Sequence, residues 1–354
     1  MIETIVKKID KQCIDKNVIQ QAGDILASGG IVAFPTETVY GLGANALDSK
    51  AIQKIFQAKG RPSDNPLIVH ISKQEDLFPL VSEVPTVAIP LMKHFWPGPL
   101  TLIFPKSSLI PKEITGGLST VGIRYPIHPI ARAIIQAAKV PIAAPSANLS
   151  GKPSPTKAEH VIHDLDGRVN MIVDGGNSIV GLESTVLDIT GKTPMILRPG
   201  GITKDMLESV IGPVLLDPTL DDGREIKKGT VPKAPGMKYK HYAPKAQIEI
   251  MVGEIETVVK NIQKRIQENK NHKKIGIMAT DQTKNKYKDS DIVVISVGDR
   301  NKPETIASHL FDVLRQFDDM DMDIIYAEGI PEVQMGMAIM NRLVKASGYH
   351  VNHV

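Results

Sequence analysis

The sequence contains one cysteine, no long apolar run and almost no excess of charge. Cys13 alone cannot form an intramolecular disulfide or a zinc site built from cysteines, and we expect it to be a small buried or incidental residue. No stretch approaches the ~18 consecutive apolar residues of a membrane-spanning helix. Residues 1–16 mix acids, bases and single apolar residues. We therefore expect a cytoplasmic protein without a targeting segment and with no membrane partner.

The charge balance is small but unevenly distributed. The 42 Lys and Arg residues against 39 Asp and Glu residues leave a net charge of +3, which gives no general argument for nucleic acid or membrane binding. Residues 224–245 carry seven Lys and Arg residues and one Glu, a local net charge of +6. Three prolines favour an extended segment there, and Tyr239 and Tyr242 lie among the basic residues. This pattern indicates contact with an anionic ligand.

Several common catalytic motifs are also missing, including the Walker phosphate loop, the zinc-protease helix and the hydrolase nucleophile elbow. The segment 41–46 (GLGANA) formally matches a dinucleotide-binding fingerprint. Its context argues against that interpretation, because a helix is predicted only from Ser49 onward and the acid that follows, Asp64, lies in a proline-rich loop. A nicotinamide-dependent oxidoreductase is therefore a distant alternative.

Length and proline distribution indicate two domains. A chain of 354 residues is long enough for two, and 23 of the 25 prolines precede residue 246. Before that point, short β-branched runs predict a mixed, curved sheet with few helices. After it, alternating strand and helix patterns predict a small Rossmann-like α/β domain with a largely parallel sheet. We place the first domain at 1–212, a basic linker at 213–246 and the second domain at 247–354.

Polar side chains at predicted strand and helix ends are candidate ligand contacts. Lys59 and Arg61 flank a glycine at a helix end. Their positive charges could bind a polyphosphate, or they could simply interact with the negative end of the helix dipole. Arg124 ends an apolar strand, so it requires a substrate carboxylate or an internal Asp or Glu. His70 also ends a strand and is by itself typical of a satisfied core histidine. Arg198 ends another strand, and a loop of small polar residues at 144–154 follows a further one.

Several of these segments together resemble one family. They are PTETVYGLG at 35–43, KGR at 59–61, NPL at 65–67, WPGPLT at 96–101, GIR at 122–124, APSAN at 144–148, EST at 183–185, LRPG at 197–200 and PGMKYKHYAP at 235–244. In this order and over essentially the whole chain, they are similar to the long, two-domain form of the YrdC-like threonylcarbamoyl-AMP synthases. The resemblance implies a YrdC-like α/β domain with a twisted mixed sheet, followed by the smaller domain.

The resemblance also implies an activity and a site. Members of this family join L-threonine, bicarbonate or CO2, and ATP into threonylcarbamoyl-adenylate and release pyrophosphate. The implied threonine contacts are Thr38, His70, Arg124, Ala144 and Ser184. The implied ATP contacts are Arg61, Asn65, Thr120, Ser146, Asn148, Ser154, Arg198 and Tyr242. Lys59, Arg61 and Arg198 would stabilise phosphate charge, and Mg²⁺ would enter with ATP without a dedicated protein cage.

Two further expectations concern partners. The product would pass to transferase proteins that complete N6-threonylcarbamoyladenosine in tRNA. Residues 238–242 of the basic linker would fold over the nucleotide as a lid. The alternative from another functional class is a non-catalytic module that binds double-stranded RNA, because YrdC-like domains have a concave surface that resembles an RNA-binding surface. Weak RNA binding is also compatible with the enzyme.

Overall fold

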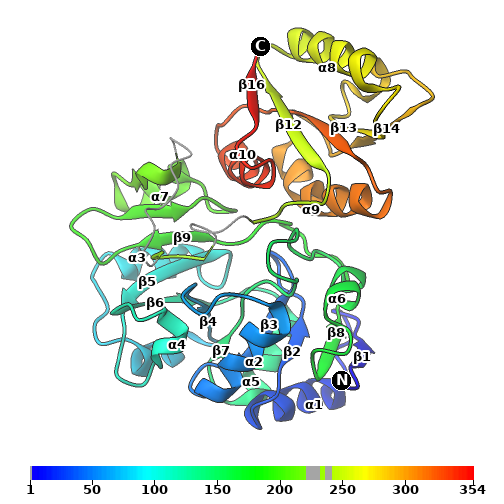
Figure 1. The fold of residues 1–354 in the computed structure, drawn as a ribbon. Coiled ribbons are helices and arrows are strands. Elements are labelled where there is room, and N and C mark those ends of the chain that lie inside the picture. Colours follow the sequence, from blue (N-terminus) through cyan, green and yellow to red (C-terminus); the bar gives the residue numbers. More distant parts are fainter. Residues whose placement is uncertain (1, 221–231, 236–240) are drawn as a thin grey trace. The chain divides into compact units, whose positions relative to one another are not determined.

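The structure is a computed structural model that describes residues 2–220, 232–235 and 241–354 (Figure 1). The chain divides into two compact units. The first comprises Met1–Ser150 and Ser154–Tyr239, and the second comprises Gly151–Pro153 and Lys240–Val354. In the ranges described, no helix is both long and apolar enough to cross a membrane.

The described part of the first unit contains a mixed sheet of eleven strands, in the order β1-β8-β2-β3-β7-β4-β6-β5-β9-β10-β11. The strands are β1 (Ile5–Lys8), β2 (Val32–Phe34), β3 (Gly41–Asn45), β4 (Ile68–His70), β5 (Leu100–Pro105), β6 (Thr120–Arg124), β7 (Ile142–Ala143), β8 (Met171–Asp174), β9 (Thr185–Asp188), β10 (Met195–Arg198) and β11 (Leu215–Leu216). Parallel pairs such as β4 with β6 lie next to antiparallel pairs such as β5 with β6. The predicted mixed sheet is confirmed, but the expectation of few helices is wrong, because seven α-helices accompany this sheet in the residues described.

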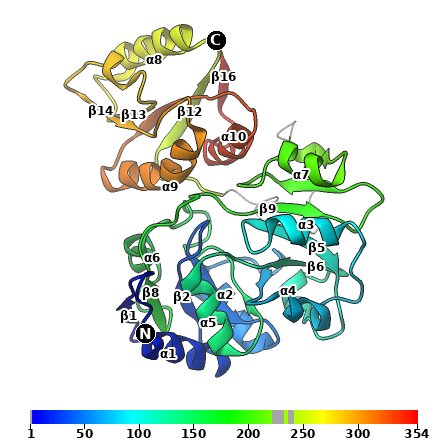
Figure 2. The same cartoon turned by 180° about the vertical axis from the view of Figure 1, so that it is seen from behind.

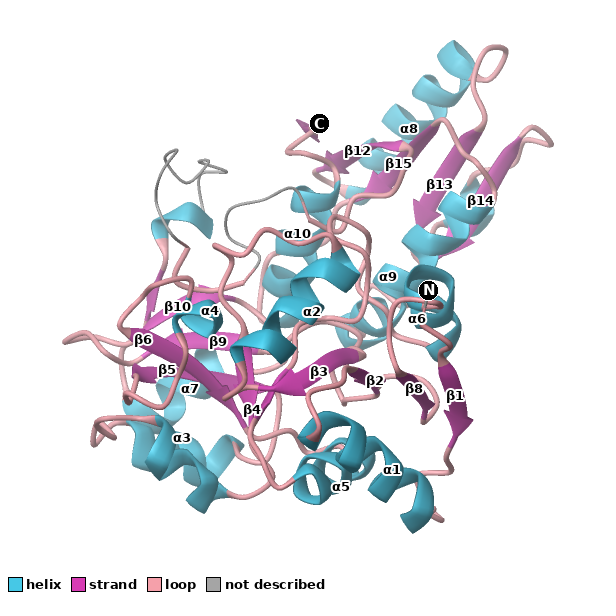
Figure 3. Ribbon diagram, turned by 60° about the horizontal axis from the view of Figure 1, so that its bottom comes forward, coloured by secondary structure: helices cyan, strands magenta, loops and turns pink. Residues whose placement is uncertain are grey.

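Helices cover both faces of this sheet (Figure 3). They are α1 (Lys16–Ala27), α2 (Ser49–Lys59), α3 (Ala88–Phe95), α4 (Lys112–Thr115), α5 (Pro129–Ala138), α6 (Ala158–Leu165) and α7 (Lys204–Ile211), with short 3-10 helices η1 (Gln74–Leu80) and η2 (Pro218–Leu220). In β2, Val32 and Phe34 pack with α1 and α5, whereas Ala33 faces the cluster built on α2 and α3. Successive strand residues point to opposite faces, so a sheet buried on both faces needs a continuous apolar run.

Helices α1 and α5 lie side by side on one face of the sheet (Figures 1 and 2). Gly23 of α1 permits their close approach, because a Cβ at that position would lie 2.7 Å from the Cβ of Ala137. The apolar residues Ile130, Ile134 and Ile135 recur at helical spacing in α5 and are buried against this face.

The segment that matches a dinucleotide fingerprint is a strand. Gly41–Asn45 forms β3, which pairs antiparallel with β2 and with β7. A Cβ on Gly43 would lie 2.6 Å from Cε1 of Phe34 and 2.9 Å from Cγ2 of Ile142. This glycine therefore serves close packing inside the sheet, and the segment has no phosphate loop that opens a helix.

Helix α2 begins at Ser49, where the sequence predicts it, and its N-cap is the preceding residue. Asp48, and not Ser49, is the N-cap, and its carboxylate accepts a hydrogen bond from the backbone N–H of Lys50. This side chain satisfies one of the backbone N–H groups that the first turn of a helix leaves without a partner. The predicted end at Gly60 is confirmed, with this glycine in the left-handed conformation at φ 60°.

The second unit contains, in the residues described, a five-stranded sheet in the order β14-β13-β15-β12-β16, and its strand pairs are all parallel. Its elements are β12 (Gln247–Val252), α8 (Ile255–Asn269), β13 (Ile275–Ala279), η3 (Lys284–Lys286), β14 (Ile292–Ser296), α9 (Pro303–Asp319), β15 (Ile324–Glu328), α10 (Met335–Ala346) and β16 (Val351–His353). Ile275 and Ile277 of β13 pack with α8. A Cβ on Gly276 would meet Phe317 of α9 at 2.7 Å. The predicted Rossmann-like α/β arrangement is confirmed.

The packing of β3 leads to a stability prediction. Gly43→Ala should destabilise the protein by about 1–3 kcal/mol, because the added methyl group must displace Phe34 and Ile142 in a close-packed interior. Urea unfolding measures this change. Gly191→Ala is the control, since a Cβ there would meet nothing nearer than 3.8 Å. Equal stability of the two variants would contradict the packing role of Gly43.

Candidate functional site

Three adjacent strands bring polar side chains to one face of the first unit's sheet. Arg124 of β6 pairs in register with His70 of β4 on one side and with Thr101 of β5 on the other. Residues paired across neighbouring strands project to the same face. All three side chains are buried. The sheet register therefore groups them into one polar cluster.

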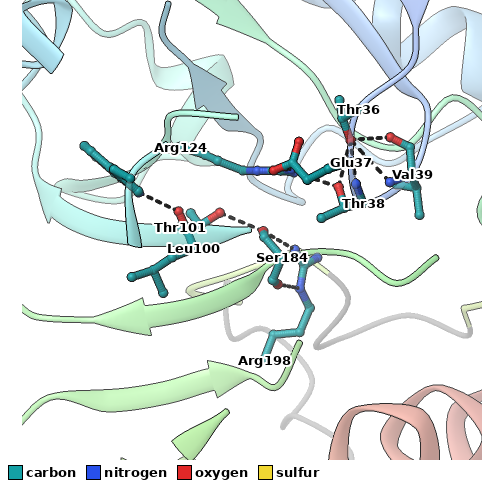
Figure 4. A network of polar contacts seen from close by, with 10 residues as sticks. Thr36, Glu37, Thr38, Val39, Leu100, Thr101, Arg124, Ser184 and Arg198 are labelled. Atoms are coloured by element: carbon teal, nitrogen blue, oxygen red, sulfur yellow. Dashed lines mark hydrogen bonds and ion pairs between the residues drawn. The ribbon is translucent and has the colours of Figure 1, made fainter. Parts of the chain in front are cut away.

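The guanidinium of Arg124 is held by the loop between β2 and β3. Its Nη1 donates to Oγ1 of Thr38 at 2.9 Å, and its Nη2 donates to Oε1 of Glu37 at 2.6 Å (Figure 4). The sequence left open whether an internal acid or a substrate would pair with Arg124. The structure supplies an internal acid, Glu37, which the sequence analysis did not select. The available signal was an acid between two threonines, directly after a buried strand.

The loop that carries Glu37 is fixed by its own hydrogen bonds. Oγ1 of Thr36 donates to the carbonyl of Val39 at 2.6 Å and lies 2.8 Å from Oγ1 of Thr38 (Figure 4). The backbone N–H of Tyr40 donates to the carbonyl of Pro155. Such local side-chain bonds define the loop conformation before any ligand arrives.

His70 is neutral. Burial, reinforced by the positive charge of Arg124, lowers its pKa to about 3. Its Nδ1 lies 3.2 Å from the carbonyl of Ile68, and the ring also contacts the backbone of Ile142. A neutral imidazole carries one N–H donor and one nitrogen acceptor, so the ring can take part in only one of these contacts as a donor.

A second set of contacts joins Ser184 to two neighbouring strands. Oγ of Ser184 lies 2.8 Å from Oγ1 of Thr101. Arg198 donates from Nη2 to Oγ of Ser184 and from Nε to its carbonyl, both at 3.1 Å (Figure 4). The structure thus places Arg198, predicted for ATP, in direct contact with Ser184, predicted for threonine.

Lys59 is buried and bound to the loop after β7. Its Nζ donates to the carbonyls of Ser146 and Asn148 and, at 3.3 Å, to Oδ1 of Asn148. The sequence predicted Lys59 as a charge beside phosphate, and that role stays a prediction. What the contacts establish is that Lys59 fixes the loop that carries two of the predicted ATP contacts.

The other predicted residues of the first unit occupy the following places. Nη2 of Arg61 donates to the carbonyl of Pro66 at 3.1 Å, while Asn65 is buried with no hydrogen-bond partner at Oδ1. Ala144 directly follows β7, and its N–H donates to the carbonyl of Ile68. Thr120 is half-buried at the start of β6. Oγ of Ser154 donates to Oε1 of Glu183 at 2.5 Å.

Two family models match the chain in succession. One, described as "Telomere recombination", matches residues 24–200, and the other, described as "Threonylcarbamoyl-AMP synthase, C-terminal domain", matches residues 202–348. The threonylcarbamoyl-AMP synthase of Bacillus subtilis (strain 168) is 52% identical over 334 residues, which are 94% of this chain and 94% of that protein. The chain belongs to the threonylcarbamoyl-AMP synthase family.

Archaeal relatives agree with this assignment. The threonylcarbamoyl-AMP synthase of Pyrococcus abyssi is 47% identical over 342 residues, covering 96% of this chain and 97% of that protein. The crystal structure of P. abyssi Sua5 complexed with L-threonine matches with a TM-score of 0.94, 47% identity, and coverage of 99% of this chain and 100% of that chain. The resemblance read from the motifs is confirmed, and this synthase is an enzyme of the nucleotidyltransferase type.

The basic linker of the synthase is described only in part. Tyr239 and much of the predicted lid at 238–242 lie outside the described residues. In the first unit, Nζ of Lys233 pairs with Asp188 at 3.1 Å, and Ala234 is buried. In the second unit, Tyr242 is buried, adopts φ 65° and stacks on Phe311 with ring centroids 5.1 Å apart. The ATP contact of Tyr242 stays a prediction.

The lowered pKa of His70 predicts a pH effect on stability. Between about pH 6.5 and 3 the unfolded chain binds a proton at this histidine while the folded protein does not, so stability falls as the pH falls. From pH 7 to pH 5 the wild type should lose about 2 kcal/mol more than His70→Gln does. Urea unfolding at both pH values checks this. His94→Gln, at an exposed ring, is the control and should lose as much stability between pH 7 and pH 5 as the wild type does. If His70→Gln also loses as much as the wild type, the neutral state of His70 is contradicted.

Proposed function

We propose that this synthase condenses L-threonine, bicarbonate and ATP into L-threonylcarbamoyl-adenylate and releases pyrophosphate. The observation that carries the proposal is the buried cluster of Thr38, His70, Arg124 and Ser184, in a chain whose P. abyssi relative was crystallised with L-threonine. Arg124 supplies a guanidinium for the amino acid's carboxylate, and Ser184 and the ring of His70 supply polar contacts. Ala144 would complete the threonine site.

The reaction needs positioning more than a protein nucleophile. The amine of threonine forms a carbamate with bicarbonate, and a carbamate oxygen then attacks the α-phosphorus of ATP in line while pyrophosphate leaves. Both new bonds form between substrates, so the enzyme contributes alignment and stabilisation of developing negative charge. Arg61 and Arg198 would supply that stabilisation. Lys59, through the loop at 146–148, would hold Ser146 and Asn148 against the nucleotide.

We also propose that Mg²⁺ enters with ATP. Magnesium in nucleotide sites takes most of its oxygen ligands from phosphates and water and only one or two from carboxylates. Among the residues described, no group of three His, Cys, Asp or Glu side chains could hold a metal ion. Glu183, which accepts a hydrogen bond from the predicted ATP contact Ser154, would be the carboxylate that assists. When bound, the ion would neutralise phosphate charge.

The wider setting is proposed on chemical grounds. The product is an activated acyl-adenylate, so a transferase must consume it, and the family assignment supports transfer to adenosine in tRNA. Weak RNA binding would serve that transfer, and a cytoplasmic location fits it. We keep Asn65, Thr120 and Tyr242 as proposed ATP contacts.

The central test measures pyrophosphate release with each substrate omitted in turn. Release should require ATP, L-threonine and bicarbonate together, and the adenylate product should appear in equal amount. RNA affinity that falls steeply with salt, without pyrophosphate release, would contradict the proposal and favour a binding module.

Arg124→Ala should raise the threonine concentration needed for half-maximal rate by roughly 30-fold or more, because it removes a desolvated charge from the carboxylate site. ATP affinity should stay within about threefold of wild type, since the variant removes no proposed phosphate contact. Arg132→Ala, which removes a half-buried arginine that lies over the ring of Tyr125, is the matched control. Equal losses of threonine and ATP affinity in Arg124→Ala would indicate a structural role.

A further inference from the structure

The ion pair between Glu37 and Arg124 is buried on both sides. Each residue is only 4% exposed, and the Nη2 to Oε1 distance is 2.6 Å. Removing two charges from water costs free energy that the attraction between them repays only in part, so a buried pair is weak evidence for a stabilising role. Its presence at the centre of the proposed threonine site points to a use in ligand binding.

The pair is also incompletely satisfied. Oε2 of Glu37 is buried and has no hydrogen-bond partner, and the same holds for Nε of Arg124. A carboxylate is an acceptor at both oxygens, and native proteins rarely leave such an atom without a donor. The unused oxygen lies beside the guanidinium that the substrate's carboxylate requires. A hydrogen-bond donor from the substrate would give Oε2 of Glu37 the partner that it lacks.

An amino acid offers that donor in the right place. Its carboxylate and its ammonium group are attached to the same carbon, so the two charges are as close together as those of Arg124 and Glu37. The ion pair is therefore complementary to a zwitterion. This reasoning rests on the proposed function, because it takes threonine as the ligand.

We propose that Glu37 is a catalytic residue: it binds the α-ammonium group of threonine through Oε2 and accepts its proton. The resulting amine attacks the carbon of bicarbonate and forms the N–C bond of the carbamate. The hydroxyl of bicarbonate leaves and combines with the second amine proton as water. For each carbamate formed, one proton remains on Glu37, which returns it to solvent after product release.

Neighbouring groups are consistent with this role. Glu37 faces Arg124 from β6 and interacts electrostatically with His128, the N-cap of α5, whose pKa is lowered mainly by burial. His70 on β4 is a poor proton acceptor, because its conjugate acid has a pKa of about 3. The negative charge of Glu37 raises the pKa of His128, and the positive charge of Lys11 lowers it. Glu37 is thus the carboxylate placed beside Arg124.

Ligand binding separates this role from simple positioning of Arg124. Calorimetry would compare L-threonine with (2S,3R)-2,3-dihydroxybutanoate, in which a hydroxyl replaces the ammonium group. Glu37→Gln should weaken threonine by roughly 10-fold to 100-fold, the range of one charge-assisted contact. The hydroxy acid should change by less than about threefold, because Arg124 still binds its carboxylate. Asp188→Asn, at another buried carboxylate, is the matched control and should bind both as the wild type does.

Each outcome decides one question. Equal weakening of both ligands would overturn the proposal and leave Glu37 as a positioning residue for Arg124. If Glu37→Gln fails to fold, the wild type still decides, since hydroxy-acid binding as tight as threonine binding would also overturn it. Absence of threonine binding by the wild type would instead contradict the proposed function.

Proton acceptance has its own readout. At saturating threonine, the rate of pyrophosphate release by Glu37→Gln should be lowest relative to wild type at neutral pH. The ratio should rise as the pH approaches the pKa of the free amino group, where deprotonated amine is available without a base. A constant ratio across the pH range would show that Glu37 takes no proton.

Discussion

The buried guanidinium of Arg124 sets the requirements that the rest of the site meets. A permanent charge at the end of an apolar strand needs a carboxylate and hydrogen-bond acceptors, and these come from Glu37 and Thr38, more than 80 positions earlier in the chain. Their loop must therefore be held against β6. The Thr36 hydroxyl fixes the loop internally through the carbonyl of Val39, and the backbone N–H of Tyr40 ties its end to the carbonyl of Pro155. Loss of either anchor would expose or unpair the charge.

Two other buried cations are also held by hydrogen bonds to polar groups of the protein, but their partners differ from those of Arg124. Lys59 and Arg198 are buried, and the backbone carbonyls and hydroxyl that they bind belong to loops or strand ends. A cation fixed in this way holds the segment that it binds, so the positive charge and the neighbouring polar groups move as one. Electrostatic stabilisation is most effective when such groups need no rearrangement during the reaction.

The sequence predicted much of this structure, and its failures have physical causes. Apolar runs located most strands, and the strand-end position of Arg124 correctly indicated a missing partner. Glu37 escaped notice because its pairing joins distant parts of the chain, whereas an acid between threonines is locally typical of a turn. Strand β3 was hidden for a related reason: Gly41 and Gly43 fit a loop motif, and only contact with Phe34 shows why Gly43 must be glycine.

The mixed sheet explains why one edge can carry the whole site. In an all-parallel sheet only the carboxyl ends of strands meet at one edge. Here β4, β6 and β10 end near their polar residues His70, Arg124 and Arg198, whereas β5 and β9 begin at the same edge. Thr101 and Ser184 therefore lie in the site at the starts of their strands, whereas the two arginines and the histidine lie there at the ends of theirs. Apolar clusters fill most of both faces of the sheet, and the polar side chains of the site gather on one face where these strands start or end. The reversal of strand direction therefore brings more polar residues to this place than strand ends alone would supply.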